Sequence, residues 1–588
     1  MRLLPMGERA LLAEVADLGR VVALHAALAA DPPAGIDDLV PAARTVLVVF
    51  DPVRIPASAV AAWIRGAASA RAEVERPGTV VSIPLRYDGP DLDDTARLLG
   101  IPVADLVTRH AAAEWTVAFT GFAPGFAYLV SRDWPWDVPR LARPRTRVPA
   151  GSVGVAGEFS GAYPRDTPGG WRLLATTGAR LFDPDAADPV LLPPRSRVRF
   201  VAERARAVAS AAAGATGGDT APLAAAGPRA AGGGSAPVAA ASPAAQEADA
   251  APTADAGARA AGGGSAPGAT AIAAASGGGS ASGGTDAADE PSRGRFSSVP
   301  LATDSPTLTV TAPGAAATIQ DLGRPGRAAL GVARSGALDR AALRIANRLV
   351  GNVEDAAGVE ILLGGFTARA ERDTWIAVTG ALSDVRIDGR AVDAYAPLPL
   401  PAGSEVSIGV ARAGLRCYLA VRGGLAVPVT LGSRSSDVLA GLGQAPVVIG
   451  DVLATGSALF PGPSVDHFPW SVPPGLVEVT VARGPRTDWF SRAALETLFE
   501  APWTVSSDAD RIGIRLDGPM LTRVRRDELP SEGMRPGAIQ VPPHGRPVVL
   551  LADGPVTGGY PVIAVVTDAG LDALAQARPG DRVRIRRG

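Results

Sequence analysis

Two neighbouring segments decide the fold: VAFTGFAPGFAYL, from Val117 to Leu129, and RVPAGSVGVAGEFSGAYP, from Arg147 to Pro164. Each consists of short runs rich in Val and aromatic residues, which Gly and Pro interrupt every few positions. This pattern is typical of short strands joined by tight turns. We therefore predict a closed or strongly curved β structure from Trp115 onward.

The region before these segments has a different pattern. It contains a helical pattern at Leu18–Ala30 and a strand-like run, TVLVVF, at Thr45–Phe50. Short elements of both kinds predict an α/β N-terminal lobe over residues 1–84. The β structure, taken as a barrel, is assigned to residues 85–202.

The C-terminal half also consists mostly of short strand patterns. Clear helices are predicted only within ALDRAALRIANRLVG at Ala337–Gly351 and SRAALETLF at Ser491–Phe499. The length of this half predicts two β lobes, at residues 301–470 and 471–588. The fold class is therefore mainly β, with an α/β N-terminal lobe.

Residues 203–300 separate the two halves and are almost entirely Ala, Gly, Ser, Thr, Pro and Asp. The stretch RAAGGGSAP occurs twice, from Arg229 and from Arg259. Such a composition offers almost no apolar surface to bury. We predict a flexible linker.

The residue counts exclude several kinds of function. The formal net charge is only -2, so neither nucleic acid nor an anionic membrane is an expected partner. Charged residues interrupt the N-terminal stretch, and no apolar run reaches the roughly 18 residues of a membrane span, so we expect a cytoplasmic protein. Cys417 is the only cysteine, which rules out disulfides and multi-thiolate metal sites within the chain.

Lysine is absent, and all 57 Lys and Arg residues are Arg. The chain therefore has no phosphate-binding lysine of the Walker type and no lysine that could carry covalently bound biotin. Apart from a protonated His, every fixed side-chain cation must therefore be the guanidinium of an Arg. Guanidiniums suit phosphate and carboxylate groups.

Three arginines alternate in RPRTRVPAGS, so Arg143, Arg145 and Arg147 share one face if the segment is a strand. The backbone amides of Gly151 and Ser152 follow directly. This pattern predicts an anion clamp, and a solvated basic face is the alternative interpretation.

Two further motifs of the N-terminal half carry candidate binding residues. In GFAPGF, Phe122, Gly125 and Tyr128 form either a ligand-facing wall or a packed barrel corner. In YPRDTPGGW the candidates are Arg165, Thr167, Gly169 and Gly170. Arg165 supplies a guanidinium and the glycines let the backbone approach a ligand closely, or the segment is simply a rigid turn.

The C-terminal half brings polar residues to a turn before its first helix. Gln320, Asp321 and Arg324 lie in IQDLGRPG, and Ser335 and Asp339 lie in RSGALD. Ser335 is either a functional hydroxyl or the N-cap of a helix that starts near Ala337. Further anion or metal-phosphate candidates are Arg422, Gly423, Ser433, Asp437 and Arg511, and Asp508 and Asp510 could hold Mg²⁺.

Several long motifs resemble known families. HAAAEWTVAFTGFAPGFAYL, PRLARPRTRVPAGSVGVAG and YPRDTPGGWRLL resemble the family of 5-oxoprolinase B subunits, also called allophanate hydrolase subunit 1. TIQDLGRPGRAALGVARSGALDRAALRIANRLVGN, YLAVRGGLAVP, LGSRSSD, DRIGIRL and EGMRPGAIQVPP resemble the family of 5-oxoprolinase C subunits, also called allophanate hydrolase subunit 2. The resemblance covers nearly everything outside residues 203–300.

This resemblance implies cyclophilin-like barrels, one in the N-terminal half and two in the C-terminal half. It implies an enzyme component that, with ATP, Mg²⁺ and a separate A subunit, opens the lactam 5-oxoproline to glutamate. The substrate class is therefore a small lactam or amide.

The resemblance also bears on individual residues. His110 matches a histidine of the B-subunit family and is a candidate for proton transfer, with a structural role as the alternative. Asp321 and Asp339 are the other catalytic candidates. Gly554 and Pro555 stand where relatives in the C-subunit family carry an Arg and a Gln, which puts in doubt an unaltered substrate site around Thr557 and Tyr560.

Two other functions are compatible with the same domains. They resemble the carboxyltransferase part of urea carboxylase, for which biotin would have to come on another chain. They also resemble inhibitors and anti-inhibitors of bacterial histidine kinases.

Overall fold

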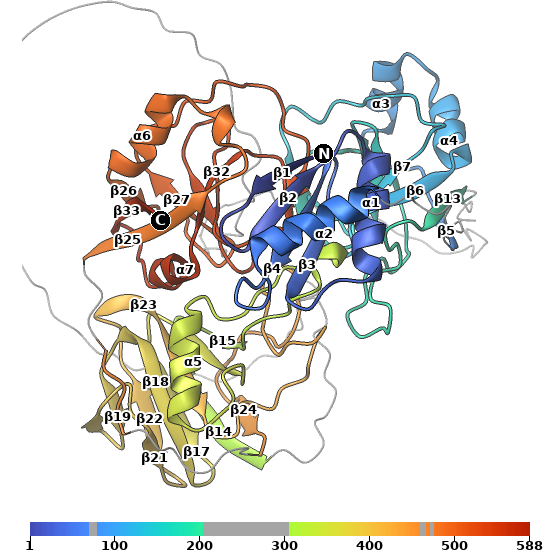
Figure 1. Cartoon of the computed structure of the whole chain (residues 1–588). Helices are drawn as coiled ribbons and strands as arrows, with labels where there is room; N and C mark the ends of the chain where they lie inside the picture. The colour runs from blue at the N-terminus through green and yellow to red at the C-terminus, as the bar shows by residue number, and fades with distance from the viewer. Residues whose placement is uncertain (70–78, 204–304, 458–465, 471–474) are drawn as a thin grey trace, which may run out of the picture.

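The computed structural model describes residues 1–69, 79–203, 305–457, 466–470 and 475–588 (Figure 1). The predicted linker at 203–300 lies, apart from Glu203, outside these residues. In the described part of the chain, no helix is both long and apolar enough to cross a membrane.

The N-terminal lobe is a four-stranded antiparallel sheet with two helices on one face (Figure 1). The predicted helix and strand are both confirmed at their expected bounds. Buried Val and Leu residues of the helices pack on one face of the sheet, and its other face is turned to the C-terminal half. The elements are β1 (Arg2–Pro5), β2 (Ala10–Glu14), α1 (Leu18–Ala30), β3 (Ile36–Pro41), β4 (Thr45–Phe50) and α2 (Ala57–Ser69).

The second unit is a strongly curved seven-stranded sheet in the order β12-β9-β10-β7-β6-β13-β5, and a bridge between Arg86 and Thr176 joins its two edges, so it is called the N-terminal barrel below. Strand β13 runs parallel to its neighbour β5, and α4 packs against β13. The first strand begins at Val80, a few residues before the predicted boundary. The elements are β5 (Val80–Leu85), α3 (Leu92–Leu99), α4 (Val103–Ala112), β6 (Trp115–Thr120), β7 (Ala127–Val130), β9 (Ser152–Ala156), β10 (Phe159–Ala162), β12 (Arg172–Thr176) and β13 (Arg197–Ala202), with a separate ribbon of β8 (Arg145–Val148) and β11 (Thr167–Gly169).

The third unit consists of two sheets that share one apolar core. Helix α5 (Arg340–Leu349) lies against the second sheet. The first sheet contains β14 (Ser305–Pro313), β17 (Phe366–Ala370), β19 (Val385–Ile387), β20 (Arg390–Val392), β22 (Glu405–Ile408) and β24 (Val452–Thr455). The second contains β15 (Ala316–Gln320), β16 (Gly358–Leu362), β18 (Thr374–Leu382), β21 (Leu398–Leu400) and β23 (Ala413–Val421).

The fourth unit is a closed seven-stranded barrel. Its strands are β25 (Leu476–Arg483), β26 (Trp503–Val505), β27 (Gly513–Asp517), β29 (Ala538–Gln540), β30 (Val548–Leu550), β32 (Val562–Val566) and β33 (Arg582–Arg587). Helices α6 (Arg492–Glu500) and α7 (Asp568–Ala575), the short turn η2 (Thr487–Trp489) and a ribbon of β28 (Glu532–Gly533) and β31 (Thr557–Gly558) accompany it. The predicted mainly β fold with an α/β N-terminal lobe is confirmed.

The two halves of the chain share an interior. Met6, Leu12 and Leu47 of the first lobe pack in one cluster with Met534 and Val562 of the last barrel. Beside this cluster, the buried Arg486 guanidinium donates through Nη2 to Glu14 Oε1 at 2.8 Å and through Nε to Glu532 Oε1 at 3.0 Å. The β-rich units are therefore held together around one junction, where residues distant in sequence meet.

Candidate functional site

The GFAPGF loop lies at this junction. The N–H of Phe122 donates to Thr557 Oγ1 at 3.0 Å, and the N–H of Gly125 donates to the Leu330 carbonyl at 2.9 Å. Leu330 belongs to the short turn η1 (Ala328–Leu330). The loop therefore joins the N-terminal barrel to both C-terminal units.

The aromatic residues behind this loop form a packed core. The Phe126 ring lies 5.0 Å from Tyr163 and 5.1 Å from Tyr128, in edge-to-face arrangements. Tyr128 is 8% exposed. Phe122 is half-buried with a positive φ of 66°, a strained conformation for a bulky residue. The arrangement favours the packed-corner interpretation for Tyr128.

Asp553, four residues before Thr557, connects two segments of the C-terminal half. Its Oδ1 accepts from Ser335 Oγ at 2.6 Å, and its Oδ2 accepts from Arg511 Nε at 2.7 Å. Arg511 also donates through Nη1 to Glu360 Oε1 at 2.5 Å. Both carboxylates are buried, so these charge-assisted bonds fix the guanidinium firmly.

The structure corrects the expected start of the helix. Helix α5 begins at Arg340, and its N-cap is Asp339, whose side chain accepts from the N–H of Ala342 at 2.8 Å. Ser335 lies upstream with a φ of 55°. Its hydroxyl therefore serves the junction and not the helix end.

Asp321 organises the loop from Ser433 to Asp437. Its carboxylate accepts from Ser433 Oγ and from the N–H of Arg434, both at 2.6 Å. Gln320 Nε2 donates to the Ser436 carbonyl at 3.0 Å. Because its oxygens are occupied by these bonds, Asp321 is a positioning residue for Asp437.

Arg324 and Asp437 are each 1% exposed and carry polar atoms without partners. Arg324 donates through Nη2 to the Ser435 carbonyl, while its Nε and Nη1 have no hydrogen-bond partner. Asp437 Oδ1 accepts from the N–H of Ala440 at 2.8 Å, while Oδ2 has none. Burial, followed by the charge of Asp553, raises the pKa of Asp437 to about 7.

Arg165 reaches the same place from the N-terminal barrel. A Cβ added to Gly441 would lie 3.7 Å from Arg165 Nη1, which is buried and has no partner. Burial lowers the pKa of Arg165, and the nearby charge of Asp437 counteracts this. Arg165, Arg324, Asp437, Arg511 and Asp553 together are called the junction cluster below.

Buried polar atoms without a partner are rare in proteins and often mark a place where something else binds. Among the described residues, five of the eleven such side-chain atoms lie at this junction, and a sixth belongs to Thr167, two residues after Arg165. The five belong to Arg165, Gln320, Arg324 and Asp437. This concentration makes the junction the candidate functional site.

His110 lies elsewhere, in the core of the N-terminal barrel. It is 0% exposed, its Nδ1 is 2.8 Å from Tyr87 Oη and its Nε2 is 2.9 Å from Ser160 Oγ. Burial lowers its pKa to about 3, so the ring is neutral. The geometry favours the structural alternative for this histidine.

The three alternating arginines are distributed between ion pairs and solvent. Arg145 Nη2 donates to the buried Asp91 at 2.6 Å, Arg147 pairs with Asp166 at 2.5 Å, and Arg143 is exposed. The following amides are also used internally, because the N–H of Gly151 donates to Tyr163 and that of Ser152 donates to Pro149. The geometry favours structural and surface roles over an anion clamp.

Other predicted residues stabilise local structure. A Cβ on Gly169 would lie 2.6 Å from Tyr163 Oη, so close packing requires this glycine, and the Gly170 carbonyl accepts from Leu141. Arg422 Nη1 donates to the Val350 carbonyl at 3.0 Å, and the N–H of Gly423 donates to Asn352 Oδ1 at 2.8 Å.

Asp339 and Tyr560 are not members of the junction cluster. Asp339 Oδ2 accepts from Gln576 Nε2 at 2.7 Å, and burial together with Asp572 raises its pKa to about 7. Tyr560 is half-buried, which raises its pKa, and it follows the strand of Thr557.

Asp508 and Asp510 do not converge on a common point for a metal ion. Asp508 is exposed and lies 3.6 Å from Arg515, while Asp510 Oδ1 accepts from the N–H groups of Ile512 and Gly513. Across the ranges that the structure describes, no three His, Cys, Asp or Glu side chains are grouped as metal ligands.

Sequence reasoning missed Glu360 and Asp553. Glu360 interrupts the apolar run GVEILL, and a buried charge in a strand requires a partner, so the sequence held a usable signal. Asp553 directly follows the apolar run VVLLA. In the structure, both bind Arg511.

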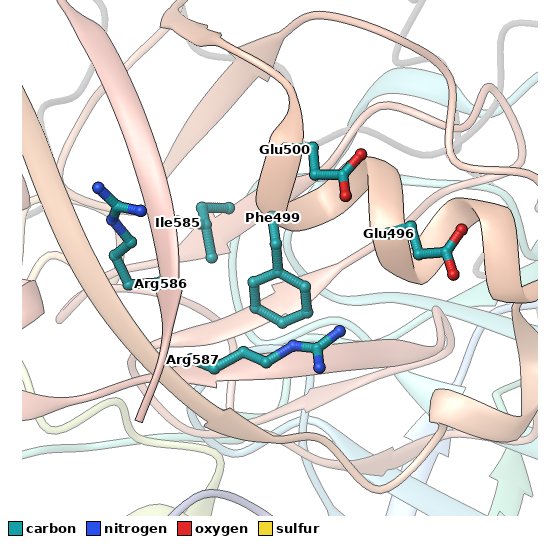
Figure 2. A pocket seen from close by; sticks show the side chains of 6 residues that line it. All are labelled: Glu496, Phe499, Glu500, Ile585, Arg586 and Arg587. Carbon is teal, nitrogen blue, oxygen red and sulfur yellow. The ribbon is translucent and has the colours of Figure 1, made fainter.

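Two surface hollows lie away from the junction. Figure 2 shows the first, where the Arg587 guanidinium lies 4.5 Å from the centre of the Phe499 ring, between α6 and β33. The second is lined by Arg372, Trp375 and Arg422, among others. Neither is lined by any of the unpartnered buried atoms, so we place the candidate site at the junction.

The matches to known protein families divide the chain into the same N-terminal and C-terminal halves. The family described as carboxyltransferase domain, subdomain C and D, matches residues 1–192, and carboxyltransferase domain, subdomain A and B, matches residues 330–587. The chain is 39% identical to the C subunit of 5-oxoprolinase from Escherichia coli K12, over 47% of this chain and 89% of that protein. It is 43% identical to the B subunit of 5-oxoprolinase from Escherichia coli O157:H7, over 22% of this chain and 62% of that protein.

A solved structure extends the likeness over nearly the whole chain. The protein TTHA0988 superimposes with a TM-score of 0.75 at 31% identity, over 98% of this chain and 99% of its own. The chain therefore belongs to the carboxyltransferase-domain family, and it joins a module like the B subunit of 5-oxoprolinase to a module like the C subunit in one polypeptide.

Proposed function

We propose that this chain is the fused B and C component of an ATP-dependent 5-oxoprolinase, which acts with a separate A subunit on a small lactam or amide. One observation carries the proposal. Modules similar to both subunits share an interior, and residues from both, Arg165 from one and Arg324 and Asp437 from the other, meet at the junction.

The chemistry requires activation of the substrate. A lactam carbonyl is stabilised by resonance and its amine is a poor leaving group, so phosphorylation of the carbonyl oxygen by ATP would make attack by water much easier. Buried guanidiniums such as Arg324 suit the oxygens of an anionic substrate, which they can bind through charge-assisted hydrogen bonds. Mg²⁺ would accompany the nucleotide, bound to its phosphate oxygens.

The family description leaves a carboxyltransferase as the second candidate. Such an enzyme would take its biotin from another chain, since this sequence contains no lysine. A regulatory protein that binds a histidine kinase is the third candidate and would need no substrate turnover.

Reconstitution separates the three functions. The purified chain is mixed with a lactam-hydrolysing A subunit, and ADP and glutamate are measured with ATP and 5-oxoproline. We expect coupled formation of both products, and little 5-oxoproline hydrolysis by the chain alone. Urea carboxylation with a biotinylated carrier, or kinase inhibition without ATP-coupled turnover, would refute the proposal.

A further inference from the structure

The junction cluster leaves a defined set of hydrogen-bonding atoms unmatched. On the donor side are Nε and Nη1 of Arg324 and Nη1 of Arg165. On the acceptor side is Oδ2 of Asp437. A polar atom that is buried without a partner loses its hydrogen bonds to water and gains none in return, so this set is destabilising unless a ligand satisfies it.

The donors come from both halves of the chain. Arg324 is held by the Ser435 carbonyl, and Arg165 approaches Gly441, four residues beyond Asp437. The charge of Asp437 acts on both guanidiniums. A small oxyanion that accepts from both arginines would therefore lie beside Asp437.

The acceptor has a fixed orientation. Because the N–H of Ala440 binds Asp437 Oδ1 at 2.8 Å, Oδ2 is the oxygen that remains for a ligand. An N–H donor on the ligand would satisfy it. The ligand would thus need an anionic group and a nearby N–H group.

The charge balance argues against a nucleotide triphosphate at this place. Four carboxyl groups face four guanidiniums in and around the cluster: Asp321, Glu360, Asp437 and Asp553 against Arg165, Arg324, Arg416 and Arg511. Because the pKa of Asp437 is raised to about 7, its negative charge is partial near neutral pH, and the positive charge of the set exceeds the negative charge by less than one. The several negative charges of a nucleotide triphosphate would far outweigh this small positive excess. A monoanion with an N–H donor suits this environment better.

We propose that the junction cluster binds the lactam acid itself, with the carboxylate of 5-oxoproline on Arg324 and Arg165 and its ring N–H on Asp437, and that the residues that bind the nucleotide lie outside this cluster, on the side of the lactam carbonyl. This inference rests on the proposed function, and it assigns the substrate to residues of both modules.

Binding to the full chain without any A subunit tests the inference. The probes are 5-oxoproline, 2-pyrrolidinone, which lacks the carboxylate, and 5-oxotetrahydrofuran-2-carboxylate, in which a ring oxygen replaces the N–H. By calorimetric titration, 5-oxoproline should bind at least about tenfold more tightly than either analogue, because each analogue lacks one charge-assisted hydrogen bond.

Two variants locate the contacts. In Arg324→Gln, 5-oxoproline should lose its advantage over 2-pyrrolidinone while keeping that over the lactone acid. In Asp437→Asn, the N–H of Ala440 holds the amide oxygen, so Nδ2 faces the ligand and the preference for 5-oxoproline over the lactone acid should disappear. Arg165→Gln should weaken binding of both acids, and thermal unfolding of each variant shows whether it is folded.

The outcomes distinguish this inference from the proposed function. Equal binding of all three probes, or unchanged selectivity in both Arg324→Gln and Asp437→Asn, overturns the inference even if the reconstituted complex hydrolyses 5-oxoproline. The predicted selectivity pattern supports it even if ATP-coupled turnover is absent. Competition between ATP and 5-oxoproline that Arg324→Gln abolishes would place the nucleotide here and also overturn it.

Discussion

The N–H of Phe122 donates to Thr557 Oγ1 across 435 residues of sequence. This bond and the neighbouring one from Gly125 to Leu330 hold the GFAPGF loop against the C-terminal half. The loop is therefore part of the contact between the two modules. The residues that contact this loop should therefore influence whether the two modules stay associated.

Gly331→Ala tests this contact. Gly331 has a φ of 77°, and a Cβ there would overlap the Ala123 carbonyl of the loop. Gly389→Ala is the matched control, because its φ is 76° and nothing lies within 4 Å of its Cβ. The positive φ should cost both variants about 1–2 kcal/mol, and only Gly331→Ala should also weaken the contact.

The measurement uses a protease site inserted between residues 203 and 305. After cleavage, the two halves should co-elute in size exclusion for the parent and for Gly389→Ala, and dissociate more readily for Gly331→Ala. Identical elution of both variants at all concentrations would argue against this role of the loop.

Arg145→Ala distinguishes an ion pair from a phosphate clamp. The side chain of Asp91 is 8% exposed and would lose its guanidinium partner, at a cost of about 1–3 kcal/mol. We therefore expect a lower Tm and unchanged ATP affinity. A normal Tm with weakened ATP binding in calorimetry would instead restore the clamp.

His110 predicts a pH dependence of stability. Its pKa is about 3 in the folded barrel and about 6.5 when unfolded, so the unfolded chain binds the extra proton between these values. Stability should fall on acidification below pH 6.5, by up to about 1.4 kcal/mol per pH unit from this residue.

His110→Gln retains hydrogen-bonding capacity toward Tyr87 and Ser160 but cannot titrate. Its urea midpoint should decline less than that of the wild type between pH 6.5 and pH 5. His467→Gln, at an exposed position, is the control and should behave like the wild type. Parallel declines in all three proteins would contradict the assignment of a buried neutral His110.

Local patterns predicted the elements better than the site. Leu18–Ala30 and Thr45–Phe50 were predictable because periodicity is a property of neighbouring residues. Arg145 and Asp91 are 54 residues apart, and Ser335 and Asp553 are 218 apart. No local pattern specifies which carboxylate a guanidinium will meet, so the alternating arginines resembled a clamp and Asp553 was missed.

The central claim is that the junction cluster carries the function of the fused chain. The most direct test is ATP-dependent glutamate formation from 5-oxoproline by the chain mixed with a lactam-hydrolysing A subunit. It compares Arg324→Ala with Arg412→Ala, which changes an exposed arginine paired with Asp384. We predict that Arg324→Ala lowers kcat/KM about 10–100-fold, as loss of charge-assisted hydrogen bonds would, while Arg412→Ala retains the wild-type value. Equal rates for a folded Arg324→Ala and the wild type would contradict the account.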